Sequence, residues 1–327
     1  MSGETWGRLL DRLATLPGHT DPDFPPELGR VVTSTPTARQ DLEAILAQSD
    51  CPPDLRFAAF YGLLIHVRRF KDWEQYTRCF ESYSGEFVDR FPMLNLLRSQ
   101  YYLNPTRRRS LALALRYAED TYTKLPAHYG VMAHLATVIV QTERTKTVPD
   151  VQALMRARDL EERAIGLQPT YARFFATKAE ILCLLGDFDG AQQAIDQAMD
   201  LEPSDSLNYA VRISDYQLIK MDIAVRQQTG QLQATQLAAQ RFIEGARAEF
   251  LTLLGLLAAV IAFIVTTSQV VSQVEASDAM LLMLTMSGCI VIVFAVFGLI
   301  FVQRQRALCV AAGIFGLILV LVAKLTI

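Results

Sequence analysis

Three long apolar runs near the C-terminus constrain this 327-residue chain more than any other feature of its sequence. The runs are 250–271, 279–302 and 307–323, and none of them contains a charged residue. The first two are longer than the roughly 20 residues that a helix needs to cross a hydrocarbon core of about 30 Å. Because a charged side chain at mid-bilayer is costly, uncharged runs of this length predict three transmembrane helices. No apolar stretch of signal-peptide type follows the N-terminus, so no secretory signal is expected.

The loops beside these runs predict how the chain is oriented in the membrane. Arg241 and Arg247 precede the first run, and Arg304 and Arg306 join the second run to the third. The loop 272–278 has two acidic residues and no Lys or Arg. The positive-inside rule then places the N-terminal part in the cytoplasm and the C-terminus outside. We expect a multi-pass protein, of the kind found in a bacterial inner membrane.

Composition and motifs argue against an enzyme, a metal protein or a nucleic-acid-binding protein. The net charge is −3, whereas a general nucleic-acid surface is normally basic. The five cysteines include no CxxC pair, and the four histidines have no metal-ligand spacing. No GxSxG, P-loop, GxGxxG or HExxH pattern occurs. We therefore expect no enzymatic activity, no cofactor, no metal and no nucleic-acid partner.

Prolines divide the polar part of the chain at a regular spacing. Pro92, Pro126, Pro169 and Pro203 are separated by 34, 43 and 34 residues. A period of 34 residues is typical of helix–turn–helix repeats that stack into a solenoid. The sequence therefore predicts an all-α solenoid before the membrane runs.

The best-defined repeat covers residues 172–205. Gly186 and Asp187 punctuate two helices, and apolar residues recur every three or four positions along the second helix. This segment resembles the tetratricopeptide repeat, with signature positions at Ala179, Gly186, Asp187, Phe188, Ala191, Ile195, Ala198, Leu201 and Pro203. Lys178 departs from the pattern, because it stands where the family has leucine. The resemblance implies paired helices that bind a protein or peptide partner.

The preceding unit matches the same pattern in two pieces, 132–139 and 157–169, and its extra residues 142–150 are expected in the turn between two helices. Farther upstream the match is degenerate. In this family the first helix of each unit lines the groove that binds a partner. The resemblance thus implies a partner-binding groove at Thr137, Val140, Arg173, Ala176 and Glu180. The last two stand where the family's carboxylate clamp uses Lys and Asn, which argues against a C-terminal carboxylate as ligand.

One basic cluster, Arg107-Arg108-Arg109, is a candidate anion site. It is expected at the N-terminus of a helix, where the dipole and free N–H groups favour anions. The alternative is a solvated basic turn without a ligand.

After Pro203, apolar and small residues recur at alternating spacings of four and three from 207 to 246. This heptad pattern predicts one long helix, which meets no proline before the first membrane run. Two interpretations remain open: capping of the solenoid by 207–225, and self-association of the glutamine-rich segment 227–240. Small residues spaced by four in the first run also allow close helix packing. The predicted oligomer seam comprises Leu218, Val225, Leu232, Phe242, Gly255 and Ala259.

These patterns predict four regions. Residues 1–40 form an N-terminal helix and an irregular lead-in, 41–205 a solenoid, 206–249 a capping or stalk helix, and 250–327 a three-helix transmembrane domain. The leading functional hypothesis is a membrane-anchored adaptor or scaffold that binds a protein partner in the cytoplasm as a homo-oligomer. The alternative is an oligomeric effector whose spans perturb or perforate the membrane when the solenoid senses a ligand. Its membrane segments resemble the tails of bacterial defence proteins in hydropathy.

Overall fold

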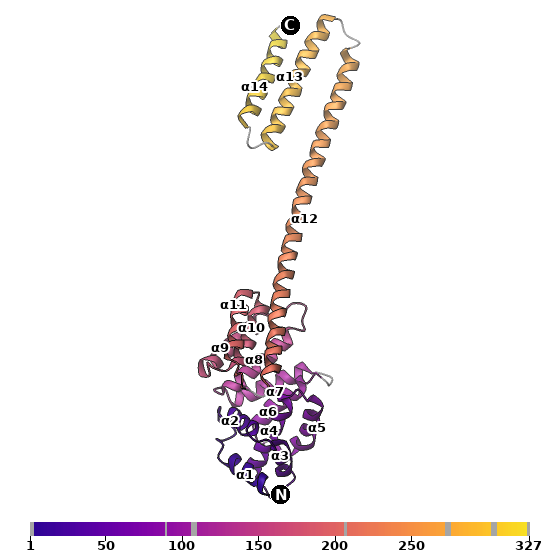
Figure 1. Cartoon of the computed structure of the whole chain (residues 1–327). Coiled ribbons are helices and arrows are strands. Elements are labelled where there is room, and N and C mark those ends of the chain that lie inside the picture. Colours follow the sequence, from indigo (N-terminus) through magenta and orange to yellow (C-terminus); the bar gives the residue numbers. More distant parts are fainter. Residues whose placement is uncertain are drawn as a thin grey trace. The chain divides into compact units, whose positions relative to one another are not determined.

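The computed structural model describes residues 3–88, 90–105, 110–205, 208–271, 276–301 and 306–325. All regular structure within these ranges is helical, which confirms the predicted all-α class. Figure 1 shows the order of the helices along the chain. The chain divides into two compact units, a first unit of Met1–Leu232 and a second unit of Gln233–Ile327.

The first unit opens with three helices, α1 (Gly3–Ala14), α2 (Phe24–Thr33) and α3 (Ala38–Leu46). Helix α2 lies within residues 1–40, where an irregular lead-in was expected after the N-terminal helix; this segment contains Pro25 and Pro26. Those prolines occupy the first turn of α2, where their missing N–H groups cost no intrahelical hydrogen bond. Leu28 and Val32 of α2 are buried beside Gly62, where the lack of a side chain allows close approach.

Helix pairs follow α3, and consecutive helices pack on each other. The bounds are α4 (Pro53–Arg69), α5 (Trp73–Tyr83), the short 3-10 helix η1 (Ser84–Phe87), α6 (Met93–Leu103), α7 (Leu111–Lys124), α8 (Tyr129–Glu143), α9 (Val151–Leu167), α10 (Ala172–Leu185) and α11 (Phe188–Leu201). A turn around Lys71 separates α4 from α5. The predicted insertion forms the turn between α8 and α9 after the last residues of α8. This arrangement agrees with a helical repeat solenoid.

Local sequence explains how the best-defined repeat is built. Gly186 ends α10 in the left-handed conformation, with φ of 85°, which glycine adopts without steric cost. The Asp187 side chain then accepts a hydrogen bond from the Gly190 N–H at 3.0 Å and caps α11. Ala191 and Ala198 are fully buried on the α10 side of α11, where their small side chains let the helices approach closely.

Helix α12 runs from Tyr209 to Val271, and residues up to Leu232 belong to the first unit. Tyr216 and Ile223 are buried in the hydrophobic cluster formed by α10 and α11. The beginning of α12 therefore covers the end of the solenoid, as the capping interpretation requires.

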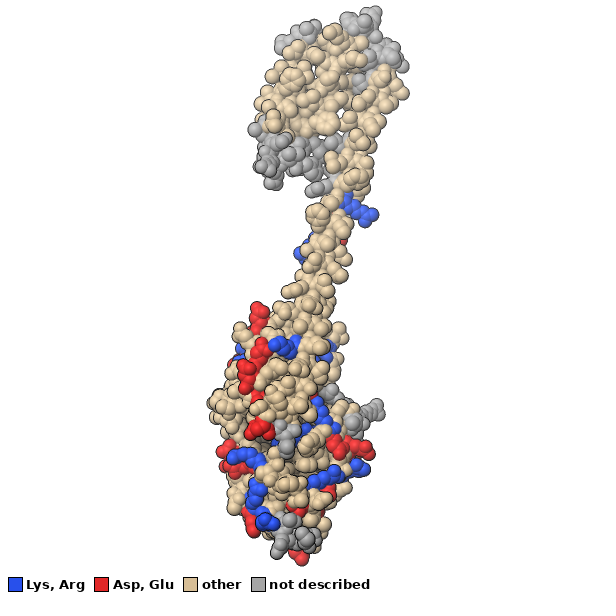
Figure 2. All heavy atoms as spheres, viewed as in Figure 1, with Lys and Arg blue, Asp and Glu red and all other residues tan. Residues whose placement is uncertain are grey.

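The second unit contains the rest of α12, α13 (Ala276–Phe301) and α14 (Arg306–Leu325). Helices α13 and α14 pack tightly, because a Cβ added to Gly288 would lie 2.7 Å from the Gly316 carbonyl oxygen. On the face shown in Figure 2, the described parts of α13 and α14 present no charged side chain.

Only one described helix is both long and apolar enough to cross a membrane, over Asp278–Val296. The sequence predicted three such helices. The segments Leu253–Val265 and Leu308–Lys324 are apolar but shorter than the span length. The structure thus supports one membrane-spanning helix among the described residues.

Candidate functional site: an arginine cluster at the helix ends

The residues predicted to line the partner groove do not share one environment. Val140 and Ala176 are buried in the hydrophobic core, so they stabilise the fold. Thr137 is half-buried, and its hydroxyl lies 3.4 Å from that of Thr177. Arg173 is the one of the five whose side chain is exposed. Glu180, the fifth, is half-buried within an ion-pair network.

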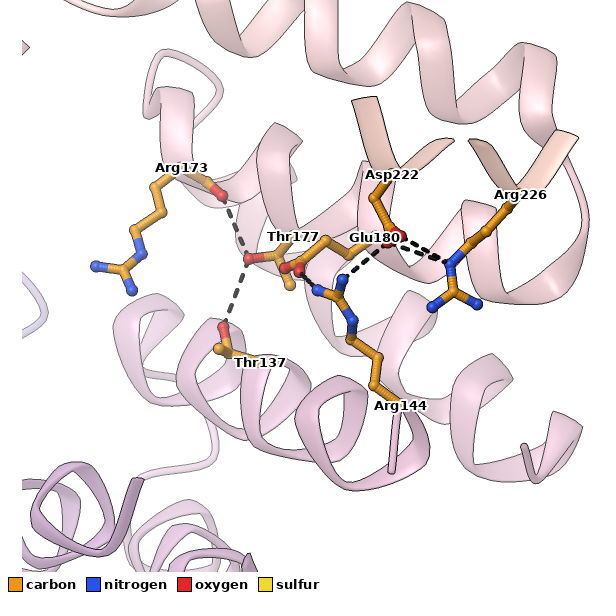
Figure 3. Close-up of polar contacts among 7 residues, drawn as sticks. All are labelled: Thr137, Arg144, Arg173, Thr177, Glu180, Asp222 and Arg226. Carbon is orange, nitrogen blue, oxygen red and sulfur yellow. Dashed lines mark hydrogen bonds and ion pairs between the residues drawn. The ribbon is translucent and has the colours of Figure 1, made fainter. Parts of the chain in front are cut away.

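That network joins α8, α10 and α12 (Figure 3). Arg144, at the end of α8, donates through Nη1 to Glu180 and through Nη2 to Asp222 at 2.8 Å. Arg226 also donates to Asp222, with Nε 3.1 Å from Oδ2. Glu180 is thus paired with Arg144, and Asp222 of α12 with both Arg144 and Arg226. Helix α12 therefore occupies the Glu180 end of the predicted groove. In Figure 3 the Arg173 guanidinium points away from this network.

Arg173 instead belongs to a group that we call the arginine cluster: Arg68, Arg69, Arg173 and Arg212. The first two end α4, Arg173 lies in the first turn of α10, and Arg212 lies in the first turn of α12. An ion pair holds the helix ends together, because Lys71 Nζ donates to Asp215 Oδ1 of α12 at 2.6 Å. The cluster therefore unites residues separated by more than 140 positions in the sequence.

The cluster produces a positive potential at its members and neighbours. Burial, and then the Arg68 guanidinium, lower the pKa of Arg173. Burial alone would raise the pKa of Tyr171, but Arg212, Arg173 and Arg68 outweigh it and hold that pKa below its ordinary value. Tyr171 and Arg173 nevertheless remain solvent-accessible. Tyr171 and Arg173 thus lie among protein atoms and positive charges, and a ligand can still reach their exposed side chains.

Few carboxylates compensate this charge. Glu202 Oε1 lies 3.4 Å from Arg212 Nε, and it is the partner of that arginine. Arg69 donates to the Thr33 hydroxyl, which carries no charge. Among the residues that the structure describes, Arg68, Arg69 and Arg173 form no ion pair. Three guanidinium charges are thus left without a carboxylate partner in the described part of the chain.

Two buried titratable groups, Glu161 and His134, lie beside the cluster, and burial favours the neutral form of each. Glu161 of α9 is fully buried, and neither of its carboxylate oxygens has a hydrogen-bond partner among the described residues. Burial raises its pKa well above the ordinary value, although Arg173 opposes the shift. On α8, burial and then Arg68 and Arg173 lower the pKa of His134 to about 3. The site therefore keeps its positive charge and attracts anions.

The positions of two cluster members strengthen this attraction. Arg173 and Arg212 stand at helix N-termini, where the helix dipole disfavours positive side chains and free N–H groups favour anions. Tyr171, at the N-cap of α10, gives that helix no side-chain cap hydrogen bond. An anion bound here would interact with guanidinium groups and helix ends together.

The protein also has an open depression of about 350 Å³ between α9, α10 and α11. Its basic members are Arg158 and Lys178, and both lie within 4.0 Å of Glu162. Because their charges are compensated, this depression is a weaker candidate for a charged ligand.

The remaining predicted sites are placed as follows. Arg107, Arg108 and Arg109 lie outside the described residues. Within the described ranges no group of His, Cys, Asp or Glu has the arrangement of a metal site. The seam residues Leu218, Val225, Leu232 and Phe242 are exposed, and Gly255 has open space beside it, whereas the side chain of Ala259 lies outside the described set.

Sequence reasoning identified Arg173 but missed Arg68, Arg69, Tyr171 and Arg212. Sequence patterns do not indicate that these residues lie close together, because they belong to three helices that are far apart in the sequence. The available signal was an arginine in the first turn of a helix, against the preference set by the dipole. Comparison of the chain with protein-family models and with curated proteins gave no match.

Proposed function

We propose that this protein is a membrane-anchored adaptor whose helical solenoid binds an anionic segment of a cytoplasmic protein partner. The arginine cluster carries the proposal, because three of its guanidinium groups form no ion pair with any residue that the structure describes, and burial favours the neutral form of Glu161 and His134 beside them. Arginine is well suited to this role, since its planar donors form paired hydrogen bonds with carboxylate or phosphate groups. Solenoid proteins commonly bind partners over such surfaces.

The membrane anchor in this proposal has three spans. Support comes from the absence of charge in the three sequence runs and from the close packing of α14 on α13 through Gly288 and Gly316. A short apolar helix packed this closely on a membrane-spanning helix shares its environment. The basic and acidic loops between the runs favour a cytoplasmic solenoid.

Self-association is part of the same proposal. The seam residues Leu232 and Phe242 are exposed, and Phe242 exposes 78% of its surface. An exposed apolar face on a helix favours a partner, and membrane tethering raises the effective concentration of a second copy. We therefore propose a homo-oligomer that pairs along α12.

The adaptor function can be tested by site-specific photo-crosslinking in native membranes. A crosslinking amino acid replaces Tyr171, beside the cluster, or Gln193, in the open depression. We expect a defined protein adduct from position 171 that Arg173→Glu abolishes, and no such adduct from position 193. Equal adducts at both positions, or adducts at 171 that persist in Arg173→Glu, would refute partner binding at the cluster.

A second candidate function is the oligomeric membrane effector. One observation favours it: Arg212 of the cluster lies on α12, the same helix that continues into the first apolar run. Ligand binding could thereby be sensed by the helix that enters the membrane. Induced expression with a membrane-potential dye and a viability count separates the two functions. Depolarisation that requires the apolar runs supports the effector, and unchanged potential and viability support the adaptor.

A further inference from the structure

The number of unpaired charges in the arginine cluster restricts the chemistry of its ligand. A single carboxylate contributes one negative charge, whereas Arg68, Arg69 and Arg173 together leave three positive charges without an ion pair among the described residues. A phosphoryl group contributes about −1.5 to −2 at pH 7 and offers three acceptor oxygens. It therefore compensates the cluster better than any one side chain of an unmodified protein.

The directions from which donors approach also favour a phosphoryl group. The cluster draws guanidinium groups from the end of α4 and from the first turns of α10 and α12. A planar carboxylate is matched by one arginine fork, whereas a tetrahedral group can accept from donors on several sides. The N-terminus of a helix of α10's length adds free N–H groups of the type that commonly bind phosphate.

We propose that the arginine cluster recognises a phosphoryl group carried by a side chain of the protein partner. Arg173 is its central donor, because its side chain is exposed in the first turn of α10 and both Arg68 and Arg212 are close enough to interact with it electrostatically. Arg68 contacts the group from α4, and Arg212 contacts it from α12. This inference rests on the proposed adaptor function and adds the modification that controls partner binding.

A phosphoryl group held by all three helices would also fix the beginning of α12 to the solenoid. Besides the buried contacts of Tyr216 and Ile223, the links at this point include the Lys71–Asp215 and Arg144–Asp222 ion pairs, whose side chains are partly exposed. Exposed pairs of this kind are individually weak. Partner phosphorylation would therefore strengthen the attachment of α12 to the rest of the first unit.

Binding can be measured with the full chain in nanodiscs of uncharged lipid and three fluorescent peptide pools. The pools share random uncharged flanking residues and carry phosphoserine, two adjacent aspartates or serine at the centre. We expect the phosphoserine pool to bind at least tenfold more tightly than either other pool at 0.15 M salt. Arg173→Gln and Arg68→Gln should each weaken that binding at least tenfold. Arg156→Gln is the matched control and should leave binding unchanged, because it removes the same charge from α9, where Arg156 forms an ion pair with Glu119 of α7.

The outcomes separate this inference from the function on which it rests. Equal binding of the phosphoserine and aspartate pools, with loss in Arg173→Gln, overturns phosphoryl recognition and leaves the anionic-partner adaptor standing. No binding of either anionic pool overturns both. Free phosphoserine that competes at the same concentration as the peptide pool overturns the assignment to a protein partner and points to a small phosphorylated molecule. Equal weakening by the Arg156 control overturns the site itself.

Discussion

The clearest energetic consequence of this fold concerns the buried carboxyl group of Glu161. Its side chain has no solvent exposure and no hydrogen-bond partner within the described ranges, and burial raises its pKa well above the value of 4.5 expected for an unfolded chain. The folded protein therefore keeps this proton at pH values where the unfolded chain has lost it. As the pH rises above about 4.5, the free energy of unfolding must fall.

The number of protons that only the folded state retains sets how steeply the free energy of unfolding falls with pH. One proton retained only by the folded state lowers the free energy of unfolding by about 1.4 kcal/mol for each pH unit. The loss begins near the unfolded pKa of 4.5 and ends where the folded group itself ionises. Glu161→Gln removes the titrating group and keeps a similar shape. We expect the variant to gain stability relative to the wild type as the pH rises from 5.5 to 7, at a rate of at most about 1.4 kcal/mol per unit.

Tryptophan fluorescence is the appropriate assay, because both tryptophans of the chain, Trp6 and Trp73, lie in the first unit. Urea unfolding of the full chain in detergent would be followed at pH 5.5, 6.25 and 7 for both proteins. Glu162→Gln serves as the control, since the Glu162 side chain is about half exposed. A stability difference between wild type and Glu161→Gln that is the same at all three pH values would refute the reasoning, as would an equal pH trend in the control.

Three further predictions test the repeat, the oligomer and the orientation. Ala198 is fully buried between α11 and α10, so Ala198→Arg should destabilise the first unit by several kcal/mol, whereas a near-wild-type urea midpoint in the same fluorescence assay would contradict the helix pairing. Leu232→Asp combined with Phe242→Asp should lower the assembly state in mass photometry without changing that midpoint, and a monomeric wild type would exclude the oligomer. In a background without native cysteines, a cysteine at Gln273 should react with an impermeant maleimide from outside and one at Gln305 should not; the reverse pattern would overturn the orientation.

Much of the solenoid could be predicted from the sequence because its signals are local. Gly186 and Asp187 mark a helix boundary by backbone conformation and capping, and the structure uses both in this way. Ala191 and Ala198 recur on one face of α11, so their burial follows from helical periodicity. The irregular lead-in was predicted wrongly, because part of it forms α2, whose first turn accommodates two prolines.

For the three apolar runs, the prediction from composition differs from what the structure supports. Absence of charge predicts three spans, but the described helices include only one, Asp278–Val296, that is long and apolar enough to cross a bilayer. The partnership of α13 and α14 depends on Gly288 meeting Gly316 across two helices. Small residues in a helix indicate that another helix can pack closely against it, but the sequence does not specify which helix that is.

By itself, the sequence determined most of the helices, the boundaries between them and the separation of a polar solenoid from an apolar C-terminal part. These features depend on periodicity, capping and the absence of charge, all of which act over a few residues. Only the tertiary structure decided that Val140 and Ala176 are core residues and that Arg173 meets Arg68 and Arg212. The physical reason is that electrostatic repulsion and burial depend on distance in space. Residues from α4, α10 and α12 come within that distance only when the solenoid has folded and α12 has covered its end.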